Sequence, residues 1–359
     1  MSNPRFSVLI PVYNVEDYLE DCLNSVIGQT FSNFEVICVE DGSTDKSPEI
    51  LKEFAKKDER IKIIYHSENK GLLAGRVTGV KEAKGDYIVF LDSDDSLKEN
   101  ALEYFDAQIS KCPVEIYMCN MDLEFSNNVG KLNKKSAKVY FGAKKQMLFS
   151  YKILFECFKK KRYAHNVIGK VIRNDLCQKV YNRVVDDKIV MCEDMYAYFM
   201  LSYFAKTFKS TNKKLYNYNL GRGVTGGKTY SYGLYKKYCQ IGYLFLDLEK
   251  FLKENNAEKE YFNLVSKMKK KYCDMLVYDY CYEVEEENKK EAGELLSNAY
   301  GEGEKGENEF HPNIQKSIDE NIKLGKIPEN LFGKFKRKVR KDGFFFTVLW
   351  AFKMLFKIR

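Results

Sequence analysis

The sequence predicts an α/β fold, in which helices flank a mixed sheet, followed by a C-terminal helical region. Short apolar runs alternate with segments of helical spacing through the first 110 residues, which is typical of a parallel sheet. From residue 231 to residue 300, Tyr and Leu recur at three- and four-residue spacing, which indicates helices. Each early apolar run ends in polar or small residues. Because the carboxyl ends of parallel strands share one edge of a sheet, we expect a ligand cleft there.

The elements of the first 110 residues follow one another in a regular order. The expected strands are residues 6–10, 34–39, 61–65 and 87–91, each a short apolar run bounded by polar residues. The expected helices are residues 16–27, 47–56, 73–83 and 97–109.

The most informative segment is the end of the strand at residues 87–91, which is followed at once by Asp92, Asp94 and Asp95. Crowded carboxylates repel one another unless a cation or a shared proton relieves them. Magnesium-like ions take one or two carboxylates together with phosphate oxygens. The run therefore predicts a divalent cation that carries a phosphate-bearing ligand.

Three other interpretations of this run stay open. Asp95 or Ser96 would cap the helix at residues 97–109. An aspartyl phosphatase would use Asp92 as its nucleophile, although such a motif usually opens its domain. A calcium loop would need a glycine where Leu97 stands, and its ligands would be Asp92, Asp94, Ser96 and Glu103.

Four segments at the strand ends carry a family resemblance: residues 8–14, residues 39–45, residues 69–71 with Arg76 after them, and residues 91–95. Together, residues 6–110 resemble the nucleotide-sugar-binding half of the inverting family 2 glycosyltransferases, which have a GT-A fold. The sequence departs from the common pattern at Glu40, where the family often has Asp, and at Val77, where it often has Asn.

The resemblance implies roles for single residues. Asp94, with Asp92, would hold Mn²⁺ or Mg²⁺ on the diphosphate of a nucleotide-sugar donor, for which a UDP-sugar is expected. The metal would neutralise charge on the departing nucleotide. Arg76 would lie near the base and the phosphates. The remaining residues expected around the nucleotide are Pro11, Tyr13, Asn14, Asp41, Asp92 and Ser93. Each has a plainer interpretation: Tyr13 would pack, Asp41 would belong to a turn, and Arg76 would be a solvated helix residue.

Inverting transfer also needs a base that takes the proton from the acceptor hydroxyl. Glu193 and Asp194 lie at the start of a helical run expected over residues 191–205. Acidic residues at a helix start are favoured by the helix dipole, so an ordinary N-terminus is the alternative. Family members carry an acidic pair here, which implies that Asp194 is the base and Glu193 supports it.

Two later segments, residues 166–173 and 216–225, resemble the strand that enters the acceptor half and the strand and loop that close the catalytic domain. Arg222 in that loop would reach the diphosphate. His165 is a further candidate on the acceptor side, with a structural role as the alternative. The chain has no Gln-x-x-Arg-Trp segment, which processive members of the family carry, so we expect the addition of one or a few sugars.

Charge is concentrated at the C-terminus. Residues 334–359 hold nine Lys or Arg and one acid, so the net charge of +8 belongs to this segment and the rest of the chain sums to zero. Aromatic and aliphatic residues beside the cations favour an amphipathic helix on an anionic membrane surface. A helix that docks on its own domain is the alternative, and nucleic-acid binding is not expected because the body is neutral.

These patterns give an expected organisation along the chain. Ten cysteines without Cys-x-x-Cys spacing and a first strand close to the N-terminus, without a signal peptide, favour a cytoplasmic protein, peripheral on the inner face of the membrane. Its acceptor would be a lipid-linked or surface glycan. A catalytically silent binding module is the non-enzyme alternative. The expected parts are 1–228 for the catalytic domain (1–110 donor half, 111–228 acceptor half), 229–300 for a helical region, 301–333 for a linker and 334–359 for a membrane-binding tail.

Overall fold

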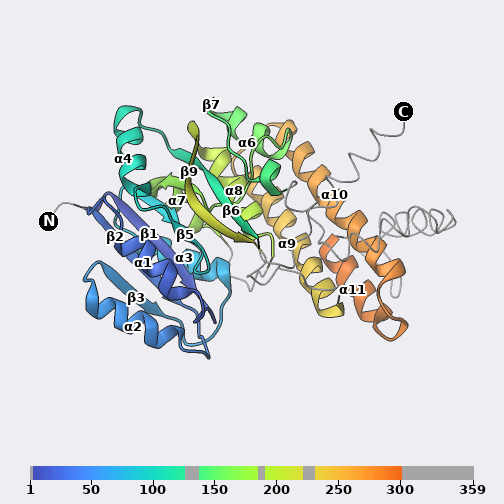
Figure 1. Cartoon of the computed structure of the whole chain (residues 1–359). Helices are drawn as coiled ribbons and strands as arrows, with labels where there is room; N and C mark the ends of the chain where they lie inside the picture. Colours follow the sequence, from blue (N-terminus) through green and yellow to red (C-terminus); the bar gives the residue numbers. More distant parts are fainter. Residues whose placement is uncertain (1–2, 126–136, 185–190, 221–230, 301–359) are drawn as a thin grey trace. The chain divides into compact units, whose positions relative to one another are not determined.

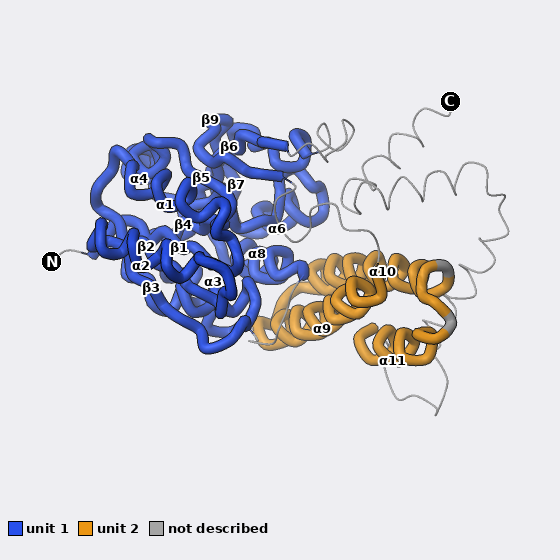
Figure 2. Tube along the Cα trace, turned by 60° about the horizontal axis from the view of Figure 1, so that its bottom comes forward, with its two compact units in different colours: residues 1–226 blue, residues 227–359 orange. Residues whose placement is uncertain are grey.

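The computed structural model describes residues 3–125, 137–184, 191–220 and 231–300. The chain divides into two compact units, residues 1–226 and residues 227–359 (Figure 2). In the first unit, helices flank a sheet; the described part of the second unit is helical (Figure 1).

Within the described residues, one sheet of nine strands runs in the order β3-β2-β1-β4-β8-β6-β9-β5, and β7 pairs with β9. The strands β1, β2, β3 and β4 are parallel, whereas β8 is antiparallel to both β4 and β6. The pair β6 and β9 is parallel again. The strands are β1 Phe6–Val12, β2 Phe34–Glu40, β3 Ile61–Tyr65, β4 Tyr87–Phe90, β5 Ser96–Leu97, β6 Ile116–Phe125, β7 Gln146–Phe149, β8 Lys170–Arg173 and β9 Thr207–Leu220.

The helices of the first unit connect these strands, and those of the second unit follow one another. In the first unit they are α1 Leu19–Ile27, α2 Ser47–Lys57, α3 Leu72–Glu82, α4 Ala101–Lys111, α6 Tyr151–Phe158, α7 Asn174–Tyr181 and α8 Glu193–Phe204. In the second unit they are α9 Tyr232–Glu254, α10 Lys259–Tyr282 and α11 Lys289–Tyr300, with a 3₁₀ turn at Glu286–Asn288.

Burial explains why the N-terminal strands form. All seven residues of β1 are buried, and so are all four of β4, as expected for central strands covered on both faces. Helix α3 approaches β1 closely because Gly79 has no side chain: a Cβ there would lie 2.5 Å from Cδ2 of Leu9. This contact brings α3, which carries Arg76, against the centre of the sheet.

The structure corrects one expected element. The helix expected at residues 97–109 begins at Ala101, because Ser96 and Leu97 form the short strand β5 beside Asn217 and Tyr216 of β9. Asp95 and Ser96 therefore do not cap this helix, whose N-cap residue is Asn100. A strand so short is hard to recognise, since its pairing depends on a partner far along the chain.

The basic tail at residues 334–359, the linker at 301–333 and Arg222 lie outside the described residues. In the part of the chain that the structure describes, no helix is long and apolar enough to cross a bilayer.

Candidate functional site

The loop after β2 is tied to the loop after β3 through Asp41. Its Oδ1 accepts a hydrogen bond from the backbone N–H of Lys70 at 2.9 Å, and its Oδ2 accepts one from Gly71 at 2.8 Å. Nδ1 of His66 lies 2.6 Å from the same Oδ1, and Nε2 of His66 lies 2.9 Å from Oγ1 of Thr78 on α3. Asp41 is thus more than a turn residue: its carboxylate joins β2, the loop after β3 and α3.

The loop after β1 is held against the loop after β2. Asn14 has a positive φ of 50°, and its Oδ1 accepts a hydrogen bond from the backbone N–H of Thr44 at 2.8 Å. Its own N–H donates to Oγ of Ser43 at 3.1 Å. Next to it, Tyr13 is 44% exposed, while Pro11 is buried near Gly75 of α3. An exposed aromatic ring on a fixed loop suits stacking against a base.

The three carboxylates after β4 point to different partners. Oδ1 of Asp92 accepts a hydrogen bond from Nη2 of Arg76 at 3.0 Å. Asp95 is buried, and its two oxygens accept hydrogen bonds from the Tyr216 hydroxyl and the Asn219 N–H, both at 2.7 Å. Burial and the negative charges of Asp92 and Asp94 raise the pKa of the Asp95 carboxyl.

The calcium-loop interpretation is wrong for this segment. Its expected ligands do not converge, because Ser96 hydrogen-bonds to Asn217 and Glu103 hydrogen-bonds to Thr30.

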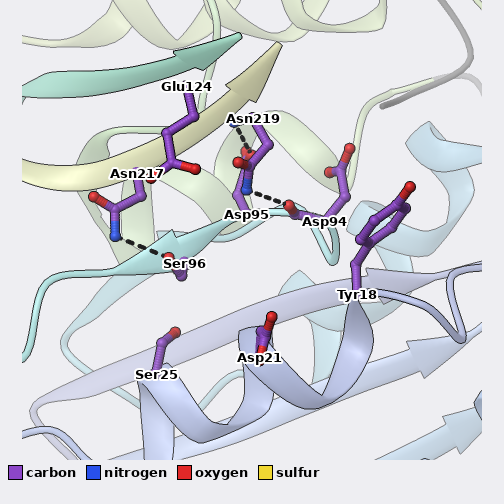
Figure 3. Close-up of a pocket in the computed structure, with 9 residues that line it drawn as sticks. All are labelled: Tyr18, Asp21, Ser25, Asp94, Asp95, Ser96, Glu124, Asn217 and Asn219. Atoms are coloured by element: carbon purple, nitrogen blue, oxygen red, sulfur yellow. Dashed lines mark hydrogen bonds between the residues drawn. The ribbon is translucent and has the colours of Figure 1, made fainter. Parts of the chain in front are cut away.

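Asp94 lines a pocket of about 390 Å³, beside the buried Ser93. In Figure 3 its carboxylate lies at the end of the loop, across from Tyr18 and Asp21 at the start of α1. Strand β9 contributes Asn217 and Asn219, whose side-chain amides hydrogen-bond to Oγ of Ser96 and to the carbonyl of Asp94. The lining residues are Tyr18, Asp21, Ser25, Asp94, Asp95, Ser96, Glu124, Asn217 and Asn219.

Arg76 joins the two acidic segments that the sequence singled out. Its side chain is 2% exposed, so the interpretation as a solvated helix residue is wrong. Nη1 donates to Oδ1 of Asp194 at 2.6 Å and lies 3.7 Å from Oε1 of Glu193, while Nη2 donates to Asp92. A buried guanidinium surrounded by carboxylates is strongly held. Removing the guanidinium or its carboxylate partners would leave a buried charge without a counter-charge.

The electrostatics of this Arg76 cluster, which consists of Arg76, Asp92, Glu193 and Asp194, follow from burial and crowding. Burial raises the pKa of the Asp92 carboxyl, Arg76 opposes that shift, and Asp194 adds to it. Burial together with the charge of Asp194 raises the pKa of Glu193 to about 7, against the effect of Arg76. Shifted acids of this kind are frequent at catalytic sites.

The backbone before α8 turns the acidic pair toward Arg76. Cys192, the N-cap residue, has a left-handed conformation with φ 62°. Non-glycine residues adopt it at a cost of about 1 kcal/mol or more, and such residues gather at functional sites. Glu193 and Asp194 occupy the first turn of α8, where the helix dipole also favours negative charge.

Some contributors to this region were missed by the sequence analysis. His66 and Thr78 complete the Asp41 network, and Tyr216 bridges Asp95 and the backbone of Asp92. No local pattern marks them, because each acts through a contact made by distant segments. His165, expected as an acceptor-side candidate, is paired through Nδ1 with the Tyr140 hydroxyl at 3.0 Å and stacks on Phe158.

The oxygen donors at the pocket fit a hard divalent cation. Asp94 presents a carboxylate there, and Mg²⁺ or Mn²⁺ needs only one or two carboxylates when phosphates and water complete its shell. Asp92 does not line this pocket and is engaged by Arg76. Among the described residues no group of three or more metal-ligating side chains is found, so a cage made of protein alone is absent there.

Comparison with known proteins decides the class. The sequence profile of the family described as Glycosyl transferase family 2 matches residues 7–208. The chain belongs to glycosyl transferase family 2. It is therefore a glycosyltransferase that depends on a nucleotide sugar, which confirms the resemblance noted in the sequence and sets aside both the phosphatase and the silent binding module.

Two bacterial relatives illustrate the match. The chain is 31% identical over 272 residues to the putative glycosyltransferase EpsH of Bacillus subtilis, covering 73% of each protein. It is 44% identical over 100 residues to the putative teichuronic acid biosynthesis glycosyltransferase TuaG of the same species. That second match covers 28% of this chain and 40% of TuaG, so only part of TuaG is represented.

Solved structures confirm the fold. TarS of Staphylococcus aureus, residues 1–349 in complex with UDP-GlcNAc, aligns with a TM-score of 0.58 at 20% identity, covering 82% of this chain and 80% of that one. The mannosyltransferase PcManGT of Pyrobaculum calidifontis, in complex with GDP-Man and Mn²⁺, aligns with a TM-score of 0.51 at 13% identity, covering 100% and 89%. The expected GT-A fold is confirmed by these matches.

Proposed function

We propose that this glycosyltransferase moves a sugar from a UDP-sugar to a hydroxyl group, with inversion at the anomeric carbon, and that a divalent metal assists. The observation that carries the proposal is Arg76, which holds Asp92 from the donor-side loop and Asp194 from the start of α8 on one guanidinium. The charged groups expected to serve donor and acceptor thereby meet at one place. The choice of UDP is supported by the fold match to TarS, which was solved with UDP-GlcNAc and with UDP.

The donor site is proposed to lie along the ends of β1, β2 and β4. Tyr13 would stack on the base, and the Asp41 network would fix the loops around it. Pro11, Asn14 and Ser93 would shape the walls. Arg222, which lies outside the described residues, would reach the diphosphate.

The metal is proposed to be Mn²⁺ or Mg²⁺ held by Asp94, with Asp92 beside it. Bound there, it would offset the negative charge that develops on the departing nucleoside diphosphate. The fold match to PcManGT, solved with GDP-Man and Mn²⁺, supports this choice. Because Arg76 already engages Oδ1 of Asp92, we assign the main ligand role to Asp94.

Asp194 is proposed to take the proton from the acceptor hydroxyl as its oxygen attacks the anomeric carbon. Its Oδ1 is oriented by Arg76, which leaves Oδ2 as the atom to receive the proton. Glu193 lies near the same guanidinium nitrogen and would support the charge balance of the site.

The acceptor is proposed to be a lipid-linked or surface glycan precursor at the inner face of the cell membrane. Names of relatives support this class: one is a teichuronic acid biosynthesis glycosyltransferase and another, from Bacillus spizizenii, is a poly(ribitol-phosphate) beta-glucosyltransferase. The basic, aromatic segment at residues 334–359 would provide a contact with anionic lipid.

A donor panel tests the proposal directly. Purified protein is given UDP-, GDP- and other nucleotide sugars with Mn²⁺ and then with a chelator, and both binding and release of nucleoside diphosphate are measured. We expect metal-dependent release of nucleoside diphosphate from one UDP-sugar. In Asp94→Asn, we expect that added metal no longer increases this release. Equal turnover in the presence of chelator would contradict the metal, and selectivity for another nucleotide would contradict UDP.

The base is tested in the same assay by Asp194→Asn. Because the amide cannot accept the proton, we expect transfer to fall by about a hundredfold or more while donor binding is retained. Glu193→Gln serves as the neighbouring control. Near-normal transfer by Asp194→Asn would remove Asp194 as the base.

A further inference from the structure

Three large apolar side chains are exposed in a row along β7 and at the start of α6. Met147 is 37% exposed, Phe149 is 54% exposed and Tyr151 is 57% exposed. Met147 and Phe149 alternate with the less exposed Gln146 and Leu148, so they share the outward face of β7. Single exposed apolar residues are ordinary, but a contiguous set on one strand and the next helix indicates an interaction surface.

The same part of the chain is strongly basic. Residues 137–162 contain eight Lys or Arg and one acid, Glu156. Glu156 is engaged by Lys160 at 2.6 Å and by Arg162 at 3.0 Å. An excess of positive charge therefore remains on this segment, although the chain up to residue 333 is neutral as a whole.

Exposed lysines flank the apolar row along the chain. Lys144 and Lys145 precede β7, and Lys152 follows Tyr151; all three are exposed. Lys206, which directly precedes β9, is also exposed, and its carbonyl accepts a hydrogen bond from the Ser150 N–H at 3.0 Å. We call these residues the β7 patch: Lys144, Lys145, Met147, Phe149, Tyr151, Lys152 and Lys206.

We propose that the β7 patch is a membrane-contact surface of the catalytic unit, with Phe149 and Tyr151 entering the interfacial layer and the lysines facing anionic headgroups. Aromatic rings at the boundary with cations around them are the pattern of surfaces that lie on anionic bilayers. A soluble polyanion would be recognised by the lysines alone and would leave the exposed aromatic rings without a role. This contact is separate from any contact made by the basic tail.

The patch is rigidly linked to the pocket that holds Asp94. Strand β9 pairs with β7 through Thr207 and Lys209 and carries Asn217 and Asn219 at its other end (Figure 1). Ten residues of extended strand span about 30 Å, so the pocket lies within roughly that distance of the patch. Contact between the β7 patch and a membrane would keep the pocket within reach of an acceptor that is anchored in the same bilayer.

Vesicle flotation of the full chain tests this contact, with phosphatidylcholine vesicles that contain or lack phosphatidylglycerol. One variant combines Phe149→Ser and Tyr151→Ser, and a second combines Lys144→Gln, Lys145→Gln and Lys152→Gln. Tyr243→Ser, which removes a tyrosine of α9 that is 50% exposed, is the matched control. The tail is unchanged in every protein, and far-UV circular dichroism without vesicles shows that each variant is folded.

We expect both patch variants to bind the anionic vesicles about tenfold more weakly or worse, with Tyr243→Ser unchanged, since each cation near such a surface contributes about fivefold. Unchanged flotation of both patch variants would overturn the proposal and leave binding to the tail. A second outcome would also overturn it: loss in the lysine variant alone, with full competition by inorganic polyphosphate, would identify a soluble polyanion as the ligand.

Discussion

At the scale of single residues, charge balance around Arg76 governs the proposed site. Its guanidinium is buried and contacts Asp92 and Asp194 directly, with Glu193 slightly farther away. Arg76→Met would leave these carboxylates without their cation. We expect the free energy of unfolding to fall by about 3–5 kcal/mol, measured by chemical denaturation, and transfer to be lost.

Arg76→Lys separates charge from geometry. Lysine keeps the positive charge but has one ammonium in place of the planar fork that reaches two carboxylates at once. We expect it to recover part of the stability and little of the transfer. If Arg76→Met were as stable as the native protein, the carboxylates would not depend on this cation.

Glu193 predicts a pH dependence of stability. Its pKa is raised from 4.5 to about 7, so between these values the folded protein keeps a proton that the unfolded chain releases. The contribution of Glu193 to stability is therefore complete below about pH 4.5 and falls as the pH rises toward 7. Glu193→Gln cannot ionise. We therefore expect its free energy of unfolding, relative to that of the native protein, to rise by about 2–3 kcal/mol as the pH increases from 4.5 to 7.

Denaturation of both proteins at several pH values measures this difference. Glu53→Gln, on the exposed surface of α2, controls for the loss of a carboxylate elsewhere. A constant difference between native protein and Glu193→Gln from pH 4 to pH 8 would contradict the raised pKa.

At the scale of elements, the loops after β2 and β3 are locked together at Gly42. This residue has φ +72°, and a Cβ there would lie 2.8 Å from the backbone nitrogen of Asn69. Gly42→Ala would add both an unfavourable backbone conformation and a clash with main-chain atoms. We expect a loss of about 2 kcal/mol or more in unfolding free energy and weaker donor binding, measured by denaturation and calorimetry.

Gly75→Ala is the matched control for this prediction. It is the fourth residue of α3, and the nearest atom to its added Cβ is Cβ of Pro11 at 3.4 Å, an ordinary contact. Alanine is the better helix former, so we expect unchanged or slightly higher stability. Equal effects of the two substitutions would show that the loop conformation at Gly42 has no special requirement.

At the scale of the whole molecule, membrane contact by the tail has its own reporter. Trp350 is the one tryptophan of the chain and stands in the basic segment at residues 334–359. We expect its fluorescence emission to shift to shorter wavelength on anionic vesicles, to stay unchanged on neutral vesicles, and to lose the shift at high salt. Flotation without any change in Trp350 emission would assign the membrane contact to the β7 patch alone.

The sequence by itself determined what depends on local pattern. Apolar spacing predicts the strands at residues 61–65 and 34–39 and the helices at 47–56, 73–83 and 191–205. The structure has each of them within about one to three residues of these bounds. The acidic run after β4 and the acidic pair at Glu193 were recognisable because each is contiguous. Family membership followed from such segments in order.

Tertiary structure decided what depends on segments far apart. Arg76 meets Asp194, which is 118 positions away, and Asp95 bonds to Asn219, which is 124 positions away. The β7 patch likewise combines exposed residues of β7, of α6 and of the segments just before β7 and β9, inside a chain whose net charge up to residue 333 is zero. Local spacing sets which elements form, but only strand pairing and helix packing bring side chains from different elements to one place. For that reason Arg76 and the acids could each be named from the sequence, whereas their meeting on one guanidinium could not.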